Sequence, residues 1–222
     1  MIYILPLLSV LIGFFIALFL KPNSSLTFKL LLSFSGAYLL SVTVFELLPE
    51  VYNSGESQIG VFIMLGLLLQ IVLEFLSKGA EHGHIHHDGN AANFPILLLI
   101  SLGIHSLLEG FPLNTSEHLL YGVAIHKIPV AAILSAFLLQ SNIGKFKVAL
   151  FLILFAFMTP LGSWMSANFE ILNEYTNYIS ALVIGIFLHV STTIIFEASK
   201  THTFNASKLA VIVAGIVLAY LL

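Results

Sequence analysis

Two stretches, His105-Ser-Leu-Leu-Glu109-Gly and His126-Lys-Ile-Pro129-Val-Ala, place ionisable groups in the middle of long hydrophobic segments. A charged side chain at the centre of a membrane-spanning helix costs roughly 2.5–3.5 kcal/mol even on lenient insertion scales, so such residues usually line a pathway or a binding site. His105 and Glu109 are four residues apart, so a helix presents both on one face, about 5–6 Å apart. This spacing predicts a pair of metal ligands inside a membrane.

Hydrophobic segments fill the rest of the chain: 59% of its 222 residues are hydrophobic and 9% are charged, with a mean hydropathy of +1.04. Soluble proteins carry about 25% charged residues, whereas a membrane-spanning helix needs about 20 mostly apolar ones. We therefore predict an all-α integral membrane protein, a single transmembrane domain over residues 1–222 built as an eight-helix bundle. The first helix lacks a basic leader and is expected to be retained rather than cleaved. The predicted spans are Ile2–Leu20, Phe28–Leu48, Ile59–Leu76, Phe94–Leu113, Leu119–Leu139, Phe146–Met165, Tyr178–Phe196 and Ala206–Leu222.

The lysines predict the orientation of this bundle. Seven of the eight lysines lie in or beside the odd-numbered connections between predicted helices, and the even-numbered connections carry glutamates but no lysine. By the positive-inside rule the odd connections are cytoplasmic, which places both termini outside. The seven are Lys21, Lys29, Lys78, Lys145, Lys147, Lys200 and Lys208; the glutamates are Glu50, Glu56, Glu117, Glu170 and Glu174.

A metal site is predicted where the fourth and fifth helices meet. Pro112 and Pro129 lack an amide hydrogen, so each is expected to kink its helix and to leave a helical carbonyl without its usual partner, close to Glu109 and His126 respectively. If the two helices pack as antiparallel neighbours, His105, Glu109 and His126 converge near the midplane, with Ser106 beside them as a further candidate metal-site residue. Two imidazoles and one carboxylate suit Zn²⁺, and also Fe²⁺ or Mn²⁺. The alternative is that each is a buried polar residue hydrogen-bonded for packing; finding all three beside two prolines favours the metal site.

The same two stretches resemble the ZIP (Zrt/Irt-like) family of metal transporters. In that family the fourth helix carries a His-Asn/Ser-x-x-Glu-Gly pattern, matched at His105, Ser106 and Glu109, and the fifth a His/Gln-x-x-Pro-Glu-Gly type pattern, matched at His126 and Pro129. The resemblance implies eight helices, both termini outside, a histidine-rich cytoplasmic loop, a homodimer, and alternating access by sliding of a bundle that contains helices four and five. A short similarity between Gly36-Ala-Tyr-Leu-Leu and Gly185-Ile-Phe-Leu-His also hints at an inverted repeat.

Two positions depart from the family pattern. Val130 stands where many members have a glutamate, and Lys127 stands where some have an aspartate that helps to hold a second ion. We hypothesise that the Lys127 ammonium replaces the second cation, offsets Glu109 when the site is empty, and repels a second divalent ion. The alternative is that Lys127 extends toward the membrane surface or pairs with another carboxylate, such as Glu46 or Glu197.

Further polar residues are candidates for the pathway or for regulation. Glu46 and Glu50 flank Pro49 near the outer end of helix two, and His189 and Glu197 lie eight residues apart, roughly on one face of helix seven. The family resemblance places helices two and seven beside the pathway, which favours a relay leading inward; the alternative is that Glu50 and Glu197 are interface residues near the headgroups. Glu74, near the inner end of helix three, is expected to be structural. The cytoplasmic loop at about 78–93 is predicted to capture metal or sense it, the alternative being a solvated linker. Its histidines are His82, His84, His86 and His87.

These residues bear on three classes of function: a transporter, a hydrolase and a signalling protein. A metal-dependent intramembrane hydrolase is the alternative to a transporter, but the familiar His-Glu-x-x-His spacing is absent. A signalling protein would need more chain outside the bilayer than these short connections provide. We predict a carrier, not an enzyme, with no catalytic cofactor and no nucleic-acid partner. It takes up Zn²⁺, or Fe²⁺, Mn²⁺ or Cd²⁺, across the plasma membrane; the uptake direction comes from the family resemblance.

Overall fold

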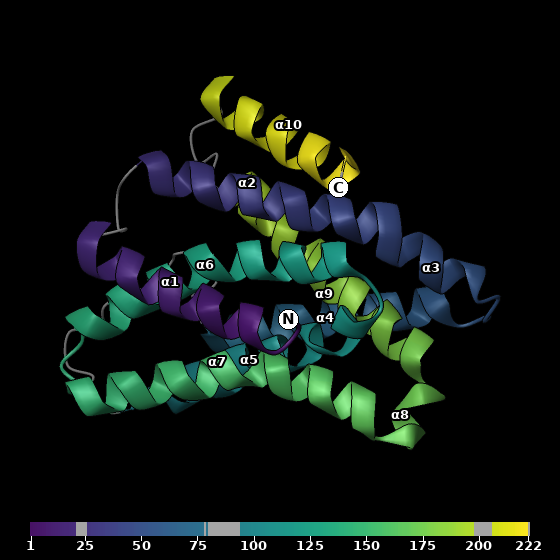
Figure 1. Ribbon diagram of the computed structural model, residues 1–222, viewed down its shortest axis with the longest axis horizontal. Helices are drawn as coiled ribbons and strands as arrows, with labels where there is room; N and C mark the ends of the chain where they lie inside the picture. Colours follow the sequence, from purple (N-terminus) through teal and green to yellow (C-terminus); the bar gives the residue numbers. More distant parts are fainter. Residues whose placement is uncertain (21–25, 78, 80–93, 198–205, 222) are drawn as a thin grey trace.

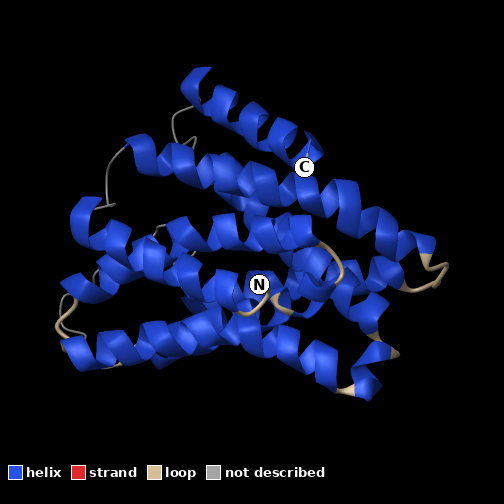
Figure 2. Cartoon of the chain, in the orientation of Figure 1, coloured by secondary structure: helices blue, strands red, loops and turns tan. Residues whose placement is uncertain are grey.

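A computed structural model describes residues 1–20, 26–77, 79, 94–197 and 206–221 of the chain. Almost all of this described part is helical (Figure 2). The helices are α1 (Ile4–Leu20), α2 (Leu26–Val42), a π-helical turn η1 (Thr43–Leu47), α3 (Leu48–Asn53), α4 (Ile59–Ser77), α5 (Ile96–Glu109), a 3-10 turn η3 (Phe111–Asn114), α6 (Glu117–Gln140), α7 (Lys145–Asn168), α8 (Glu170–Asn173), α9 (Thr176–Glu197) and α10 (Ala206–Leu221).

Each of the eight predicted apolar runs coincides with one long helical segment. Within the described residues, six segments are long and apolar enough to cross a membrane, whereas the first and last helices are shorter. The chain is thus a multi-pass membrane protein, and eight spans with outward termini remain a prediction. The six are Leu26–Asn53, Ile59–Ser77, Ile96–Asn114, Glu117–Gln140, Lys145–Asn168 and Thr176–Phe196.

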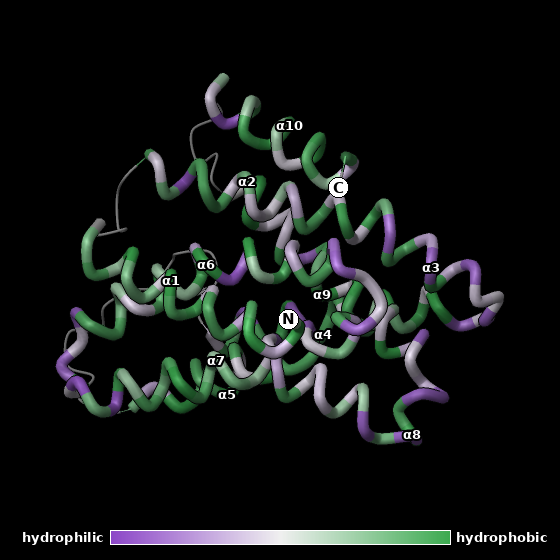
Figure 3. The backbone as a smooth tube through the Cα atoms, viewed as in Figure 1, coloured by the Kyte–Doolittle hydropathy of each residue, from purple (hydrophilic) through white to green (hydrophobic). Residues whose placement is uncertain are grey.

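Hydrophobic stretches follow the helices, and hydrophilic stretches gather at the turns on two opposite sides of the molecule (Figure 3). Helices α2, α7 and α10 all begin on the left in Figure 1, and their first turns carry Lys29, Lys145 with Lys147, and Lys208. The turns joining α3 to α4 and α7 to α9, which carry Glu56 and Glu174, lie on the right. The described lysines and glutamates of the connections therefore segregate to opposite ends, as the positive-inside pattern predicts.

The helices pack in two groups that share a boundary. The first group, called the motif bundle because it carries both motifs, comprises α1, α5, α6 and α7: α1 packs along α6, and α5 packs along α7. The second bundle comprises α2, α4, α9 and α10: α4 packs along α9, and α2 packs along both α9 and α10. Figure 1 shows α10 lying on α2 at the edge of the molecule. Helix α6 gives one face to each of the two hydrophobic cores, and the bundles meet where α2 contacts α6 and α4 contacts α5.

Glycines let backbones touch inside each bundle, as small residues do in membrane helix pairs. A Cβ added at Gly66 of α4 would lie 1.8 Å from the carbonyl oxygen of Leu182 in α9, and one at Gly162 of α7 would lie 2.0 Å from that of Leu107 in α5. At the boundary the fit is looser, because a Cβ at Gly122 of α6 would lie 3.5 Å from Tyr38 of α2. The close glycine contacts thus lock α4 against α9 and α5 against α7.

This packing predicts the effect of adding one methyl group. We expect Gly185→Ala to destabilise the protein by about 1–3 kcal/mol, the usual cost of overpacking, because its Cβ would lie 2.0 Å from the carbonyl oxygen of Ile63. Gly103→Ala is the matched control, since its nearest neighbour would be Met158 at 3.8 Å and alanine is the better helix former. Thermal unfolding in detergent measures both; equal melting temperatures would contradict the expectation.

Candidate metal site

The first motif occupies the last turns of α5. His105 Nε2 lies 3.6 Å from Glu109 Oε2, and both side chains are buried. The helix ends immediately after Glu109, where Gly110 packs so closely on α7 that a Cβ there would lie 2.2 Å from the carbonyl oxygen of Thr159. Phe111 begins the 3-10 turn, and Pro112 is its second residue. The α-helix therefore ends before Pro112, and Glu109 lies at this helix end inside the protein.

Lys127 of α6 forms an ion pair with Glu109 across the motif bundle. Its Nζ bonds to Glu109 Oε1, donates to Ser106 Oγ at 2.9 Å, and lies 4.6 Å from the centre of the Phe155 ring. Lys127 is 2% exposed and Glu109 1% exposed. Of the alternatives for Lys127, the structure thus favours the pair with Glu109, whereas Glu46 contacts other residues.

Glu109 is the centre of this cluster. Its Oε1 accepts from Lys127 and from the Thr159 hydroxyl, at 2.7 Å from the latter, and its Oε2 faces His105. A buried ion pair is tolerated when further hydrogen bonds and good geometry offset the loss of water. Ser106, Thr159 and the Phe155 ring supply these contacts here. The charges of Glu109 and Lys127 cancel within this cluster, which explains how the chain can bury both of them.

The second nitrogen of His105 is held by a residue of another helix. Its Nδ1 lies 3.0 Å from the side-chain oxygen of Gln70 in α4, and Gln70 is 0% exposed. One turn away, the Ser101 hydroxyl donates to the carbonyl oxygen of Leu73. These two hydrogen bonds join α5 to α4 across the boundary between the bundles.

His126 is buried on α6, one residue before Lys127. Successive residues of a helix point about 100° apart, so with Lys127 directed at Glu109, His126 points elsewhere. Within the part of the chain that the structure describes, no group of three or more His, Cys, Asp or Glu side chains is placed to hold an ion. The three-ligand site of His105, Glu109 and His126 therefore stays a prediction. Helix α6 continues without interruption through Pro129.

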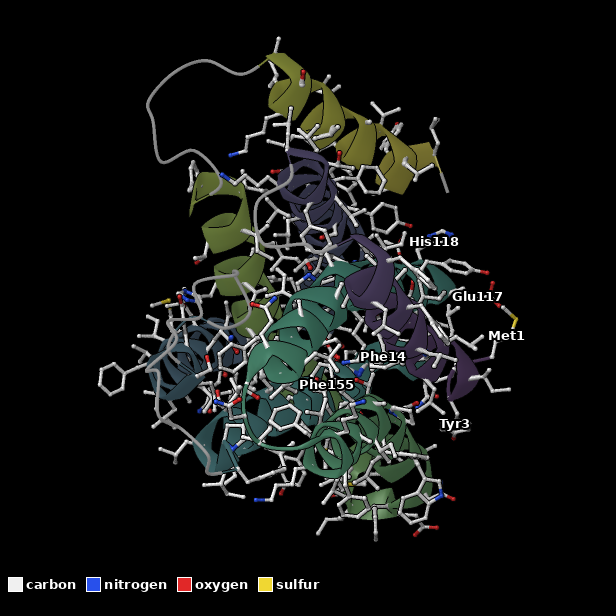
Figure 4. All side chains as sticks on the ribbon, turned by 90° about the vertical axis from the view of Figure 1, so that its left-hand side faces the viewer. Met1, Tyr3, Phe14, Glu117, His118 and Phe155 are labelled. Atoms are coloured by element: carbon white, nitrogen blue, oxygen red, sulfur yellow. The ribbon has the colours of Figure 1, made fainter. Side chains whose placement is uncertain are left out.

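A second polar cluster joins the π-helical turn of α2 to the start of α6. Glu46 Oε1 lies 2.5 Å from His118 Nδ1, and Glu46 Oε2 accepts from the Ser116 hydroxyl at 2.5 Å. Ser116 also caps α6 by accepting from the amide of Leu119. Figure 4 shows His118 and Glu117 at the edge of the molecule near Met1, and Phe155 among the helices. A π-helical turn inside an α-helix often marks a functional site.

His189 pairs with Glu74, a contact that the sequence did not predict. His189 Nε2 of α9 lies 2.5 Å from Glu74 Oε2 of α4, and both side chains are half-buried. From the sequence we expected a relay of His189 and Glu197 on one helix and a structural role for Glu74. The contact between α4 and α9 could not be predicted, because residue spacing within one segment does not tell which helix packs against it. Glu197 is the last residue of α9 and its side chain lies outside the described residues.

Glu50 and the loop histidines are the remaining candidates from the sequence. Glu50 is exposed on α3. The four histidines of the predicted cytoplasmic loop, His82, His84, His86 and His87, lie outside the described residues. Sequence reasoning missed Gln70, His118 and Thr159 as neighbours of the candidate residues. Only Gln70 carried a signal, since it is an uncharged polar residue in the middle of a mostly apolar helix.

The family model of the ZIP zinc transporters matches residues 77–222, which include both motifs. The chain belongs to the ZIP family. Members of this family are transporters rather than enzymes, which agrees with the prediction that the chain is not an enzyme.

Curated relatives support the same assignment. Zinc transporter ZIP9-B of Xenopus laevis is 29% identical over 161 residues, covering 64% of this chain and 52% of that protein. Zinc transporter ZIP1 of Danio rerio is 24% identical over 140 residues, covering 60% of this chain and 46% of that protein. Zinc transporter ZIP1 of Plasmodium falciparum is 22% identical over 249 residues, covering 76% and 70% respectively. The chain spans about half the length of the first two relatives.

Proposed function

We propose that the chain carries divalent metal ions, with Zn²⁺ as the main substrate, across the membrane toward the cytoplasm. The observation that carries the proposal is the buried cluster of His105, Glu109 and Lys127, enclosed by helices of membrane-spanning length. Ionisable groups at such a depth mark pathways. Relatives named zinc transporters favour Zn²⁺ as the ion that passes along this pathway. Fe²⁺, Mn²⁺ and Cd²⁺ fit the same ligands and are further substrates to test.

Binding begins with competition between the ion and Lys127 for Glu109. A divalent ion that approaches Glu109 repels the ammonium, and this repulsion is strong where the dielectric constant is low. The Lys127 side chain has a flexible stem, so its ammonium can withdraw toward Ser106 while the ion takes His105 and Glu109. Rotation or a small shift of α6 then adds His126 as the third ligand. Because metal ligands must be unprotonated, binding at these histidines releases protons.

Two half-buried pairs extend this route toward the ends of the bundle. Glu46 and His118 lie near the end where α6 begins, and His189 and Glu74 lie near the end where α4 finishes. Each pair offers one imidazole and one carboxylate, which are ligands suited to Zn²⁺. With the orientation given by the lysines, the first pair receives ions from outside and the second passes them inward, where the histidine-rich loop captures them.

Movement between the two open states occurs at the boundary between the bundles. Backbones interlock at glycines within each bundle, while the contact of Gly122 with Tyr38 across the boundary is of ordinary length. The family resemblance implies sliding of a bundle that contains α5 and α6, and we propose that the motif bundle of α1, α5, α6 and α7 slides against the second bundle of α2, α4, α9 and α10. The family resemblance also implies a homodimer, which we place in the plasma membrane. The short sequence similarity between α2 and α9 indicates an inverted repeat, which would give two equivalent end states.

Zinc flux into proteoliposomes tests the proposal. We expect the parent to take up Zn²⁺, and His105→Ala to reduce uptake at low Zn²⁺ by more than about 100-fold, since losing even an outer-shell partner of a ligand costs roughly 10- to 100-fold. His202→Ala changes a histidine outside both motifs and serves as the control. A parent protein that takes up no ion, or a variant as active as the parent, would contradict the proposal.

A further inference from the structure

Gln70 is a buried polar residue without a role in the transport cycle proposed above. It lies in the middle of α4, in the second bundle, and its side-chain oxygen is 3.0 Å from Nδ1 of His105 in the motif bundle. A fully buried amide has a large desolvation cost that hydrogen bonds must offset. The hydrogen bond between Gln70 and the predicted ligand His105 is therefore part of what keeps this amide buried.

This contact bears on which nitrogen of the imidazole carries the hydrogen. With the Gln70 oxygen as the acceptor, Nδ1 of His105 is the donor, and a ring with a single hydrogen leaves Nε2 unprotonated. Nε2 is the nitrogen that faces Glu109, at 3.6 Å from its Oε2. The hydrogen bond made by one ring nitrogen determines which tautomer presents the other to a metal. Gln70 thus directs the free lone pair of His105 toward the carboxylate that would share the ion.

An amide is also the acceptor that preserves the charge balance of the cluster. Glu109 and Lys127 already neutralise each other in a fully buried setting. A carboxylate in place of Gln70 would add an unbalanced negative charge, which is costly to bury. A glutamine orients His105 in the same way and leaves the net charge of the site unchanged.

The position of Gln70 is fixed by two neighbouring contacts. Ser101, one turn before His105 on α5, donates to the carbonyl oxygen of Leu73 on α4, so the two helices share two hydrogen bonds. Gly66, one turn before Gln70, seats α4 directly against the backbone of α9 at Leu182. Helix α4 is therefore held between α5 and α9 with Gln70 facing His105.

We propose that Gln70 is the positioning residue for His105, and that it acts only while the two bundles are in the register seen here. The inference rests on the proposed function, since it assigns Gln70 a role in holding the transported ion. Sliding by one helical turn, about 5.4 Å, takes Gln70 out of hydrogen-bond range of His105. The imidazole is then no longer oriented, so the site binds the ion more weakly after sliding than before, which favours release.

The tautomer of His105 in the parent protein is the first test, and it needs no variant in the second bundle. Imidazole ¹⁵N chemical shifts of ¹⁵N-histidine-labelled, metal-free protein distinguish protonation at Nδ1 from protonation at Nε2. The His105 signal is assigned by its loss in His105→Ala. We expect a neutral ring protonated at Nδ1; a ring protonated at Nε2 would overturn the inference.

Zinc uptake by Gln70→Met, Gln70→Glu and Gln58→Met is the second test. Methionine keeps the length of the side chain but removes the acceptor, so we expect KM for Zn²⁺ to rise about 10- to 100-fold with the maximal rate little changed. Glutamate keeps an accepting oxygen, so KM should stay close to that of the parent, while the cost of its unbalanced buried charge should appear as a lower melting temperature. Gln58 is exposed before α4, and its variant should match the parent.

The outcomes separate this inference from the proposed function. If the parent transports Zn²⁺ and Gln70→Met has the KM of the parent, Gln70 does not position a ligand and the inference fails. If Gln70→Glu is as impaired as Gln70→Met, the accepting oxygen is not what matters, and the inference fails as well. A parent that transports no ion counts against the proposed function, while the tautomer measurement then decides the role of Gln70 by itself.

Discussion

Replacing Glu109 with glutamine is expected to abolish zinc uptake and to destabilise the protein by about 3–5 kcal/mol, the cost of leaving one member of a buried ion pair unpaired. The Lys127 ammonium, 2% exposed, would face a neutral amide without its counter-charge. Thr159 would also lose its carboxylate acceptor. Thermal unfolding in detergent and zinc flux into proteoliposomes measure the two effects on the same preparations.

A double variant separates the ligand role of Glu109 from its role in stability. Glu109→Gln with Lys127→Met removes both charges, so we expect most of the lost stability to return, because replacing a whole buried pair by uncharged groups is often neutral or stabilising. Zinc uptake should stay absent, because the predicted ligand is still missing. Glu170→Gln, exposed on α8, is the control for loss of a carboxylate. Recovery of uptake in the double variant would mean that Glu109 is needed for stability and not as a ligand.

The fold was largely predictable from sequence because its two signals are independent of tertiary contacts. Apolar length located the segments that became the long helices, and the lysines predicted which helix ends share a side of the molecule. The break at Pro112 was also foreseeable, since a missing amide hydrogen acts locally. By contrast, Pro129 lies inside an uninterrupted α6, and the π-helical turn at Thr43–Leu47 had no recognisable signal.

The candidate site was only partly predictable, because spacing along one helix says nothing about which helix lies opposite. The proximity of His105 and Glu109 followed from their separation of four residues. The partners from other helices did not: Gln70 reaches His105, Glu74 reaches His189, and Thr159 reaches Glu109. The contacts of Glu74 and Thr159 depend on how closely α4 approaches α9 and α7 approaches α5, which is set by Gly66 and Gly162; the role of these glycines appears only once the helices are packed.

The role of Lys127 as a built-in cation gives the second large expected effect. If its ammonium takes the place of a second metal ion, Lys127→Asp removes that cation and adds a carboxylate beside Glu109. Two neighbouring carboxylates repel each other, and a second divalent ion relieves this repulsion. We therefore expect about one Zn²⁺ per chain in the parent and about two in Lys127→Asp, measured by metal analysis of purified protein after dialysis. An unchanged ratio would contradict the hypothesis.

Two further variants show which property of Lys127 matters. Lys147→Asp changes an exposed lysine of α7 in the same way and should keep the parent ratio. Lys127→Met removes the charge without adding a ligand, so its ratio should remain about one while Glu109 is left as an uncompensated buried anion. A bound ion must then supply the missing positive charge, and an ion that binds only the folded state adds about 2.7 kcal/mol of stability at 100 times Kd. Zinc should therefore raise the melting temperature of Lys127→Met more than that of the parent, because the parent already holds a cation at Glu109.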